Sequence, residues 1–566
     1  MRRFGVVFAA LAMVVGACGQ QAAPGGSAPA SASASGGPVK GGTLIVAIWQ
    51  EPAHLAPHYT NQTVQSVVLN PVVEGLLSST PSGDYQPTLA KAVPTVGNGG
   101  VKIAADGKTM DVTYQLQPGI KWSDGAPFTS ADVRFTWQTI MTDPKVTTRE
   151  GYDQIGSIDT PDDVTAVVHF KAIYSPYPTL FDRMLAKHVL EKEADISKSD
   201  YVRRPLGTGP FKITEFKAGE SFTLERNPNY RVAGQPYLDR IIFKSVPSSQ
   251  VAIAQLKAGE VQVMWLLLES EAALLDKETG IKVVTTPGPS VERVEMNTAQ
   301  NKNQTDPNSV HPVLGDVNVR RALIYATPKQ QIIDKLLFGR GKVGTTVLSQ
   351  GWAAPKDVTQ ESYDPKKSNE LLDKAGWVKG GDGIRTKGGV RASLTINTTT
   401  GNATRDQIEQ VLADEWKQIG VELKIQNMPS SVILSGVWPT DPRKRGEYDL
   451  AEYASSPDPD PHFIVSQRYH SKNIPSAANG GLGQNYTRVK NPEMDKAIEE
   501  AGATLDFEKR KAAYARALKI LNEEAVIIWL FDRASINGFR TTVQGQGPGS
   551  PWRSFTYNAG EWWQSK

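Results

Sequence analysis

A single stretch of the sequence, residues 114–141, constrains the fold more than any other because it joins a strand, a turn and a helix. Its first residues have the pattern of a strand end, and Asp124-Gly125 supplies turn chemistry. Thr129 lies three residues before Asp132, which is the spacing of a capping box, and apolar residues follow at helical spacing. The stretch therefore predicts a strand, turn and helix unit packed onto a core.

Length and charge exclude several classes of protein. A chain of 566 residues is too long for one core and predicts two or three domains. Lys+Arg 62 against Asp+Glu 59 gives a net charge of +3 with no long run of one sign, so no nucleic-acid partner is expected. Beyond the first twenty residues, no apolar run is long enough to span a bilayer.

The first residues have the pattern of an export signal. A basic start is followed by a short apolar segment that ends in small residues before Cys18, the single cysteine. This ending resembles a bacterial lipoprotein lipobox, which implies cleavage before Cys18 and lipid attachment to its sulfur. The alternative is a plain secretory signal with a chance cysteine. Residues 19–42 are mostly Gln, Ala, Pro, Gly and Ser, a composition typical of a flexible tether.

The remaining chain alternates strands with helices. Residues 43–49 form an apolar run that predicts a buried strand, and residues 241–265 predict a strand, a helix and a strand. Residues 211–226 predict a hairpin. Val291 to Thr298 predicts a strand that begins after the punctuation Pro287-Gly288-Pro289. This order is typical of an α/β fold with a mostly parallel sheet.

Several phrases, in order along the chain, resemble the extracytoplasmic solute-binding proteins of peptide-type ABC importers. The resemblance implies an α/β, two-lobed, periplasmic-binding-protein-like fold of type II, large and with an extra subdomain. The phrases are KWSDGAPFTSADVRFTW (121–137), LGTGPF (206–211), MNT (296–298), DVNVRRALIYATPK (316–329) and YDPKKSNELLDKAGW (363–377).

The resemblance and the punctuation of the sequence together predict seven segments. They are a lipoprotein signal peptide (1–17), a flexible tether (18–42), the first part of lobe I (43–83), an extra subdomain of lobe I (84–205), the second part of lobe I (206–290), lobe II (291–535) and a return to lobe I (536–566).

Candidate ligand-binding residues lie at strand ends or are aromatic residues outside helical faces. Ligands of open α/β sheets bind near strand ends, and exposed aromatic rings can stack on a peptide side chain or a sugar ring. Resemblance adds the residue after Met296 and the loop that follows Tyr453. The candidates are Trp49, Glu51, Trp265, Asn297, Trp352, Trp438, Tyr453, Ser455 and Asp458.

The phrase YASSPDPDP (453–461) separates two classes of solute. In peptide-binding members of the resembled family, an aspartate at the place of Ser455 pairs with the free amine of the peptide. A hydroxyl cannot supply that charge-assisted anchor, and it suits the hydroxyl groups of a sugar better. A peptide or peptide-like solute is the first expectation, and an oligosaccharide is the alternative.

No catalytic, cofactor or metal motif is evident, so we expect no enzymatic activity, no cofactor and no bound metal. Gly207 and Gly209 lack the Lys-Ser/Thr and helix of a phosphate loop. Asp458, Asp460 and His462 could form a hard-metal loop, but the alternating prolines favour an extended, rigid loop. A secreted hydrolase is the enzyme alternative.

The resemblance implies the function of a ligand-capturing subunit, which delivers its solute to a membrane permease that a separate ATPase subunit drives. The expected partners are the solute, the permease, the ATPase subunit through the permease, and the membrane through the lipid anchor. No nucleic acid is expected, and the protein is expected to be a monomer. Its expected location is outside the cytoplasm, anchored to the cell membrane by lipid. A surface sensor or chaperone-like binding lipoprotein is the alternative.

Overall fold

The structure, a computed structural model, describes residues 37–52, 54–59, 62–147, 149–299, 309–434, 438–455 and 458–565. Pro38–Lys566 forms one structural unit. Cys18, the signal peptide and most of the tether lie outside the described residues, so their roles remain predictions. In the described ranges, no helix combines the length and apolar character needed to cross a membrane.

An eleven-stranded sheet organises the chain, in the order β18-β17-β19-β12-β20-β11-β1-β10-β9-β8, with β13 paired to β20. The predicted α/β class is therefore confirmed. The expectation of a mostly parallel sheet is wrong, because among the described strands only β1 with β10 and β11, and β17 with β18 and β19, pair in parallel. The strands are β1 (Thr43–Ile48), β8 (Phe211–Lys217), β9 (Ser221–Arg226), β10 (Arg240–Ser245), β11 (Val263–Met264), β12 (Ile281–Met296), β13 (Gly341–Val343), β17 (Ser393–Asn397), β18 (Glu422–Ile425), β19 (Leu450–Ser455) and β20 (Ile527–Arg540).

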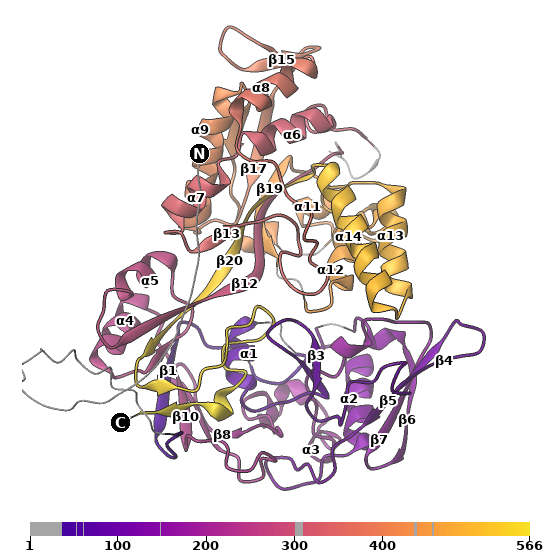
Figure 1. The fold of residues 1–566 in the computed structure, drawn as a ribbon, viewed down its shortest axis with the longest axis vertical. Helices are drawn as coiled ribbons and strands as arrows, with labels where there is room; N and C mark the ends of the chain where they lie inside the picture. The colour runs from indigo at the N-terminus through magenta and orange to yellow at the C-terminus, as the bar shows by residue number, and fades with distance from the viewer. Residues whose placement is uncertain are drawn as a thin grey trace, which may run out of the picture. The chain divides into compact units, whose positions relative to one another are not determined.

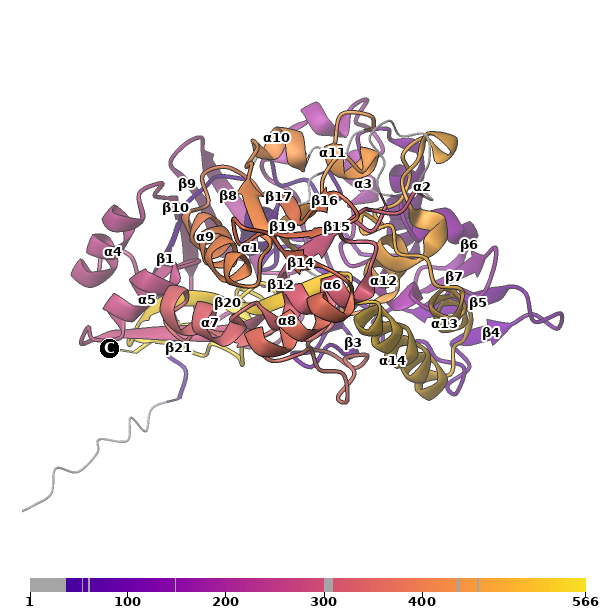
Figure 2. The same cartoon turned by 90° about the horizontal axis from the view of Figure 1, so that it is seen from above.

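Separate apolar cores divide this sheet into two lobes. The first lobe contains β1 and β8–β11 with the helices α1 (Thr63–Leu69), α4 (Ser249–Ala258) and α5 (Glu269–Leu275). The second lobe contains β17–β19 and the helices that pack around them, and α9 lies beside β17 (Figure 2). Its helices are α6 (Val317–Tyr325), α7 (Lys329–Leu336), α8 (Pro365–Lys374), α9 (Ala403–Gln418), α10 (Ser430–Ile433), α11 (Pro442–Arg445), α12 (His462–Tyr469), α13 (Pro492–Ala503) and α14 (Phe507–Glu523).

Two long antiparallel strands, β12 and β20, pass from one lobe to the other (Figure 1). The prediction that a strand begins only at Val291 is wrong, because β12 starts ten residues earlier, at Ile281. Pro287 pairs with Ala534 and Val291 with Asp532, so the intervening residues form an irregularity inside the strand. Proline and glycine are tolerated there because a bulge needs no regular ladder of hydrogen bonds.

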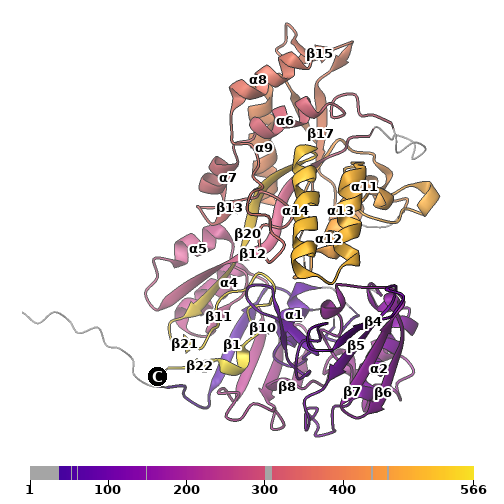
Figure 3. The same cartoon turned by 45° about the vertical axis from the view of Figure 1, so that its right-hand side comes forward.

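An antiparallel four-stranded sheet lies beside α2 (Ser130–Thr142), as Figure 3 shows. Together they form a subdomain with its own apolar core. The predicted capping box is present, and the Thr129 backbone N–H donates to the Asp132 carboxylate at 2.8 Å. The subdomain's strands are β4 (Val101–Ile103), β5 (Met110–Gln115), β6 (Ile155–Asp162) and β7 (Thr165–Phe170). The remaining short strands are β2 (Leu77–Ser79), β3 (Tyr85–Pro87), β14 (Val378–Lys379), β15 (Arg385–Lys387), β16 (Val390–Arg391), β21 (Val543–Gln544) and β22 (Trp563–Gln564).

One further helix and the short 3-10 helices lie between these elements. The helix is α3 (Lys187–Leu190), and the 3-10 helices are η1 (Tyr152–Gln154), η2 (Tyr177–Thr179), η3 (Ile196–Lys198), η4 (Asp200–Val202), η5 (Ser471–Asn473), η6 (Ala477–Asn479) and η7 (Ala559–Glu561).

The predicted domain boundary at 290/291 falls inside β12, and the one at 535/536 falls inside β20. The first coincides with the irregularity in β12, and the second lies near the pairing of Ser535 with Thr286. Val543 and Trp562 belong to the core of the first lobe, so the chain ends in that lobe after crossing back on β20.

Candidate ligand-binding site

The strands of the two lobes present their C-terminal ends to each other. β12 runs from the first lobe to the second. Because β11 and β12 are both antiparallel to β20, β11 runs in the same direction as β12, and so does β1, which is parallel to β11. β19 is antiparallel to β12, and β17 and β18 run with β19, so all three run towards the first lobe. Because ligands of open α/β sheets bind outside these carboxyl ends, the space between the two sets of ends is the candidate site.

On the side of the first lobe, two predicted residues form an aromatic pair. Trp49 follows β1 and Trp265 follows β11, and their rings stack with centroids 6.2 Å apart and planes 13° apart. Trp265 is 5% exposed, whereas Trp49 is 43% exposed. The buried ring therefore supports an exposed ring at the strand ends.

The side chains of two other predicted residues form hydrogen bonds with backbone groups. The Glu51 carboxylate accepts a hydrogen bond from the Gly219 N–H at 2.6 Å, in the turn between β8 and β9. Asn297 is buried, and its amide donates to the carbonyl oxygens of Gly446 and Tyr448 at 3.1 and 2.9 Å. Both contacts hold loops in place.

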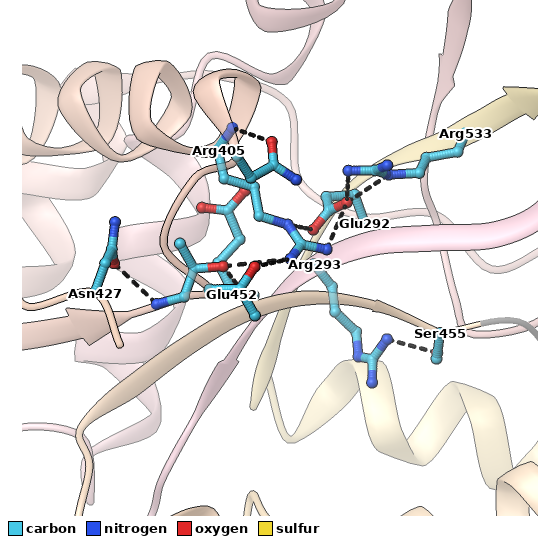
Figure 4. Close-up of polar contacts among 10 residues, drawn as sticks. Glu292, Arg293, Arg405, Asn427, Glu452, Ser455 and Arg533 are labelled. Carbon is cyan, nitrogen blue, oxygen red and sulfur yellow. Dashed lines mark hydrogen bonds and ion pairs between the residues drawn. The ribbon is translucent and has the colours of Figure 1, made fainter. Parts of the chain in front are cut away.

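On the side of the second lobe, Tyr453 and Ser455 of β19 lie on the same face of the sheet as Arg293, a buried residue of the neighbouring strand β12. Arg293 donates to the Ser455 hydroxyl at 2.5 Å (Figure 4). Its guanidinium lies 4.4 Å from the centroid of the Tyr453 ring. Glu295 pairs with Arg293 at 2.8 Å and accepts a hydrogen bond from the Tyr453 hydroxyl. Arg293 thus orients the end of β19 that faces the first lobe.

The opposite face of the same strands holds a second charged group, next to α9. Glu292 is fully buried and pairs with Arg405 at 2.9 Å and with Arg533 at 2.6 Å, as Figure 4 shows. Glu409 of α9 accepts a hydrogen bond from Asn427 at 2.7 Å. Burial and the nearby Asp406 raise the pKa of Glu409 to about 7.

Glu452 is the member of this charged group whose carboxyl group lacks a hydrogen-bond partner among the described residues. It is 1% exposed, and both carboxylate oxygens lack such a partner. Burial, followed by the charges of Glu292 and Glu409, raises its pKa well above the ordinary value. These surroundings favour the protonated, neutral form of Glu452.

The raised pKa of Glu452 gives a pH-dependent prediction for the stability of the fold. Because the folded pKa of Glu452 is raised, its contribution is fully present below the unfolded pKa of about 4.3 and is lost as the pH rises through the folded value. We expect Glu452→Gln to leave stability unchanged at pH 4 and to raise it at pH 8. Thermal unfolding across this pH range measures the difference. Glu370→Gln, which alters an exposed carboxylate, is the control, and an equal effect of both variants would contradict the prediction.

Asp458 lies where the second lobe faces the subdomain. Its side chain reaches solvent, but desolvation by the surrounding protein, together with Asp182 of the subdomain and Asp460, raises its pKa to about 6. Desolvation and the Asp458 charge also raise the pKa of Glu150 to about 8. The Ser175 hydroxyl donates to the Gly502 carbonyl at 2.6 Å and connects the subdomain to the second lobe.

Trp352 and Trp438, the remaining predicted residues, pack within the second lobe. The Trp352 indole N–H donates to the Pro459 carbonyl at 3.1 Å, and the Arg510 guanidinium lies 5.2 Å from its ring centroid. Trp438 lies against Gly481, where a Cβ would come within 2.4 Å of the Trp438 side chain. Both rings shape the lobe next to the loop that carries Asp458.

Two cavities in the described part of the chain contain none of the predicted site residues. One, of about 500 Å³, lies where β12 and β20 lose register and includes Asp532 and Arg533. The other, of about 670 Å³, lies in the first lobe and includes Glu74 and Trp552. No three His, Cys, Asp or Glu side chains of the described ranges are placed to hold a metal ion.

Sequence reasoning missed the charged residues that organise the second-lobe strand ends. The signal was present in VERVEM (291–296), where charged residues occupy both faces of an apolar strand. Buried charges require partners. On one face Arg293 and Glu295 pair with each other, and on the other face Glu292 pairs with Arg405 and Arg533 from other elements.

Comparison with known proteins gives consistent matches. The model of the bacterial extracellular solute-binding proteins, family 5, matches residues 84–476, well over half of the chain. The oligopeptide-binding protein AppA of Bacillus subtilis is 28% identical over 573 residues, covering 99% of this chain and 98% of AppA. The structure of AppA from Bacillus subtilis in complex with a nonapeptide has a TM-score of 0.70 at 27% identity and covers 94% of this chain and 100% of that one.

A second solved structure, NikZ from Campylobacter jejuni in complex with Ni(L-His), has a TM-score of 0.73 at 25% identity and covers 92% of this chain and 99% of that one. The resemblance stated from the sequence phrases and the two-lobed fold are thereby confirmed. The chain belongs to the bacterial extracellular solute-binding proteins, family 5.

Proposed function

We propose that this chain captures a peptide between the strand ends of its two lobes and delivers it to the permease of an ABC importer. The observation that carries the proposal is the convergence of two sets of C-terminal strand ends, one bearing Trp49 and the other Ser455. The peptide-binding names of relatives such as AppA support the class of solute. Binding would favour the closed arrangement of the lobes, because only that arrangement offers contacts from both.

Asp458 offers a counter-ion for the amine of a peptide, a role that Ser455 cannot fill. Its carboxylate lies close enough to Asp182 and Asp460 for their charges to raise its pKa. A concentration of negative charge at one end of the site favours a solute with a free ammonium group. The negative charge around Asp458 therefore favours a peptide over an oligosaccharide.

Replacement of Asp458 tests this role. We expect Asp458→Asn to weaken binding of a peptide with a free amine by about 10- to 100-fold and to leave the N-acetylated peptide unaffected. Because the carboxylate form is required, the affinity of the wild-type protein should fall as the pH drops below about 6. Isothermal titration calorimetry measures both effects. Equal losses for the free and the acetylated peptide would contradict the assignment.

A ligand screen tests the solute class. A ligand that binds only the folded state at 100 times its Kd raises stability by about 2.7 kcal/mol. We expect thermal unfolding to shift upwards with peptides of two to nine residues and not with oligosaccharides. A shift with oligosaccharides alone would establish the alternative solute, and peptides recovered as fragments by mass spectrometry would establish a hydrolase.

The proposal includes a lipid anchor at Cys18, which rests on the resemblance of residues 15–18 to a lipobox. The full-length protein should be recovered with the membrane fraction, and Cys18→Ala should release it. Mass spectrometry of the N-terminal peptide identifies the modification. Loss of uptake of the bound peptide in cells that lack this protein would distinguish delivery to a permease from a sensor role.

A further inference from the structure

The first-lobe edge of the site carries a strained leucine beside the exposed tryptophan. Leu266 follows Trp265 and has a φ of 60°, a left-handed conformation that costs a leucine about 1–2 kcal/mol. Its side chain is 40% exposed, although an apolar side chain gains free energy by burial. Strain of this kind persists only where the surrounding structure holds it, and it concentrates at functional sites.

Hydrogen bonds on three consecutive residues hold this conformation. The Trp265 N–H donates to the Ala47 carbonyl at 3.0 Å, and the Leu267 N–H donates to the Ile536 carbonyl at 2.8 Å. Between them, the Leu266 N–H donates at 3.1 Å to the side-chain oxygen of Asn537, which is 2% exposed. The turn is therefore fixed to β1 on one side and to β20 on the other.

The same bonds place Leu266 and Trp49 at one edge of the sheet. Val46 and Ala47 of β1 pair with Val263 and Met264 of β11, so the residues that follow the two strands are neighbours. Trp49 stacks on Trp265, the residue directly before Leu266. An exposed indole ring and an exposed leucine thus follow two neighbouring strands at the ends that face the second lobe.

We propose that Trp49 and Leu266 form an apolar subsite that selects a peptide with an aromatic or branched aliphatic side chain. The inference rests on the proposed function, because the subsite lies in the same interlobe site. The face of Trp49 that does not contact Trp265 offers a flat apolar surface, on which a ring of the solute gains both burial and stacking. Asn537 is a positioning residue, since it holds the Leu266 turn without touching the solute.

The test compares peptides that differ in one side chain. Alanine-based pentapeptides carrying a single Phe, Leu or Ser at each position in turn are titrated into the wild-type protein by calorimetry. We expect Phe or Leu to bind at least about tenfold more tightly than Ser at one position. Trp49→Ala should reduce this preference to below about twofold.

Two further variants separate the subsite from a general loss of stability or apolar surface. Leu266→Gly relieves the left-handed strain, so it should preserve or raise the melting temperature while it lowers the preference for Phe and Leu. Leu274→Ala removes a 66% exposed leucine of α5 and should leave the preference unchanged. A Trp49→Ala or Leu266→Gly protein that retains the wild-type preference would overturn the subsite.

The outcomes also distinguish the subsite from the proposed function. Tight peptide binding with no side-chain preference at any position would overturn the subsite and leave peptide capture intact. Absence of binding for every peptide would overturn the proposed function and the subsite with it.

Discussion

Replacing Gly207 by alanine is expected to destabilise the protein by about 3 kcal/mol or more. A Cβ at this position would lie 1.8 Å from the Val72 carbonyl oxygen and 2.5 Å from its carbon. Both atoms belong to the backbone, which cannot move aside as a flexible side chain can. The neighbouring Gly209 N–H donates to the same carbonyl at 2.9 Å, so separating the two segments would also break a hydrogen bond.

The measurement is the thermal and denaturant unfolding of Gly207→Ala beside Gly381→Ala. A Cβ at Gly381 would meet no atom within 4 Å, so this control should unfold like the wild-type protein. The phrase LGTGPF is then explained by close approach of two backbones rather than by phosphate binding. An unchanged melting temperature for Gly207→Ala would refute this explanation.

Removing the carboxylate of Asp460 is expected to cost about 3–5 kcal/mol, because it leaves Arg510 buried without its counter-ion. The two side chains form a pair with two hydrogen bonds, at 2.6 and 2.8 Å, and both are largely buried. The pair fixes the segment after Asp458 to α14. Asp460→Ala should therefore lower the melting temperature strongly and weaken solute binding as a consequence.

An exposed pair of the same chemistry is the control for Asp460→Ala. Asp200 and Arg204 form an ion pair at 2.6 Å with exposed side chains, and Asp200→Ala should cost less than about 1 kcal/mol. Adding Arg510→Met to Asp460→Ala should restore part of the lost stability, since the unpaired buried charge is then gone. Equal costs for Asp460→Ala and Asp200→Ala would contradict the assignment.

Local chemistry made several elements predictable from the sequence. The capping box of Thr129 and Asp132, the hairpin of β8 and β9 and the start of α8 at Asp364-Pro365 each depend on residues only a few positions apart. The N-terminal half of β12 was missed because Pro287 and Gly288 are ordinary signs of a turn. The partner strand β20 continues beside them, and a tertiary contact of this kind leaves no local signature.

The candidate site divides in the same way. The position of Trp49 at a strand end was predictable because it ends an apolar run. That its ring stacks on Trp265, 216 positions further along, depends on the parallel pairing of β1 with β11. Glu452 gave no signal, because its burial beside Glu292 and Glu409 follows from three elements far apart in the chain.

The most direct test of solute capture between the strand ends is photo-crosslinking of a bound peptide to the full chain, with the linked residues identified by mass spectrometry. A peptide with a photoreactive phenylalanine analogue should link to the segment from Trp49 to Glu51 or to Leu266 from the first lobe. With the reactive group moved along the peptide, it should link to Ser455 or Asp458 from the second lobe. Excess unlabelled peptide should abolish both links. Competed links confined to one lobe, or to the cavity beside Asp532 and Arg533, would contradict capture between the lobes.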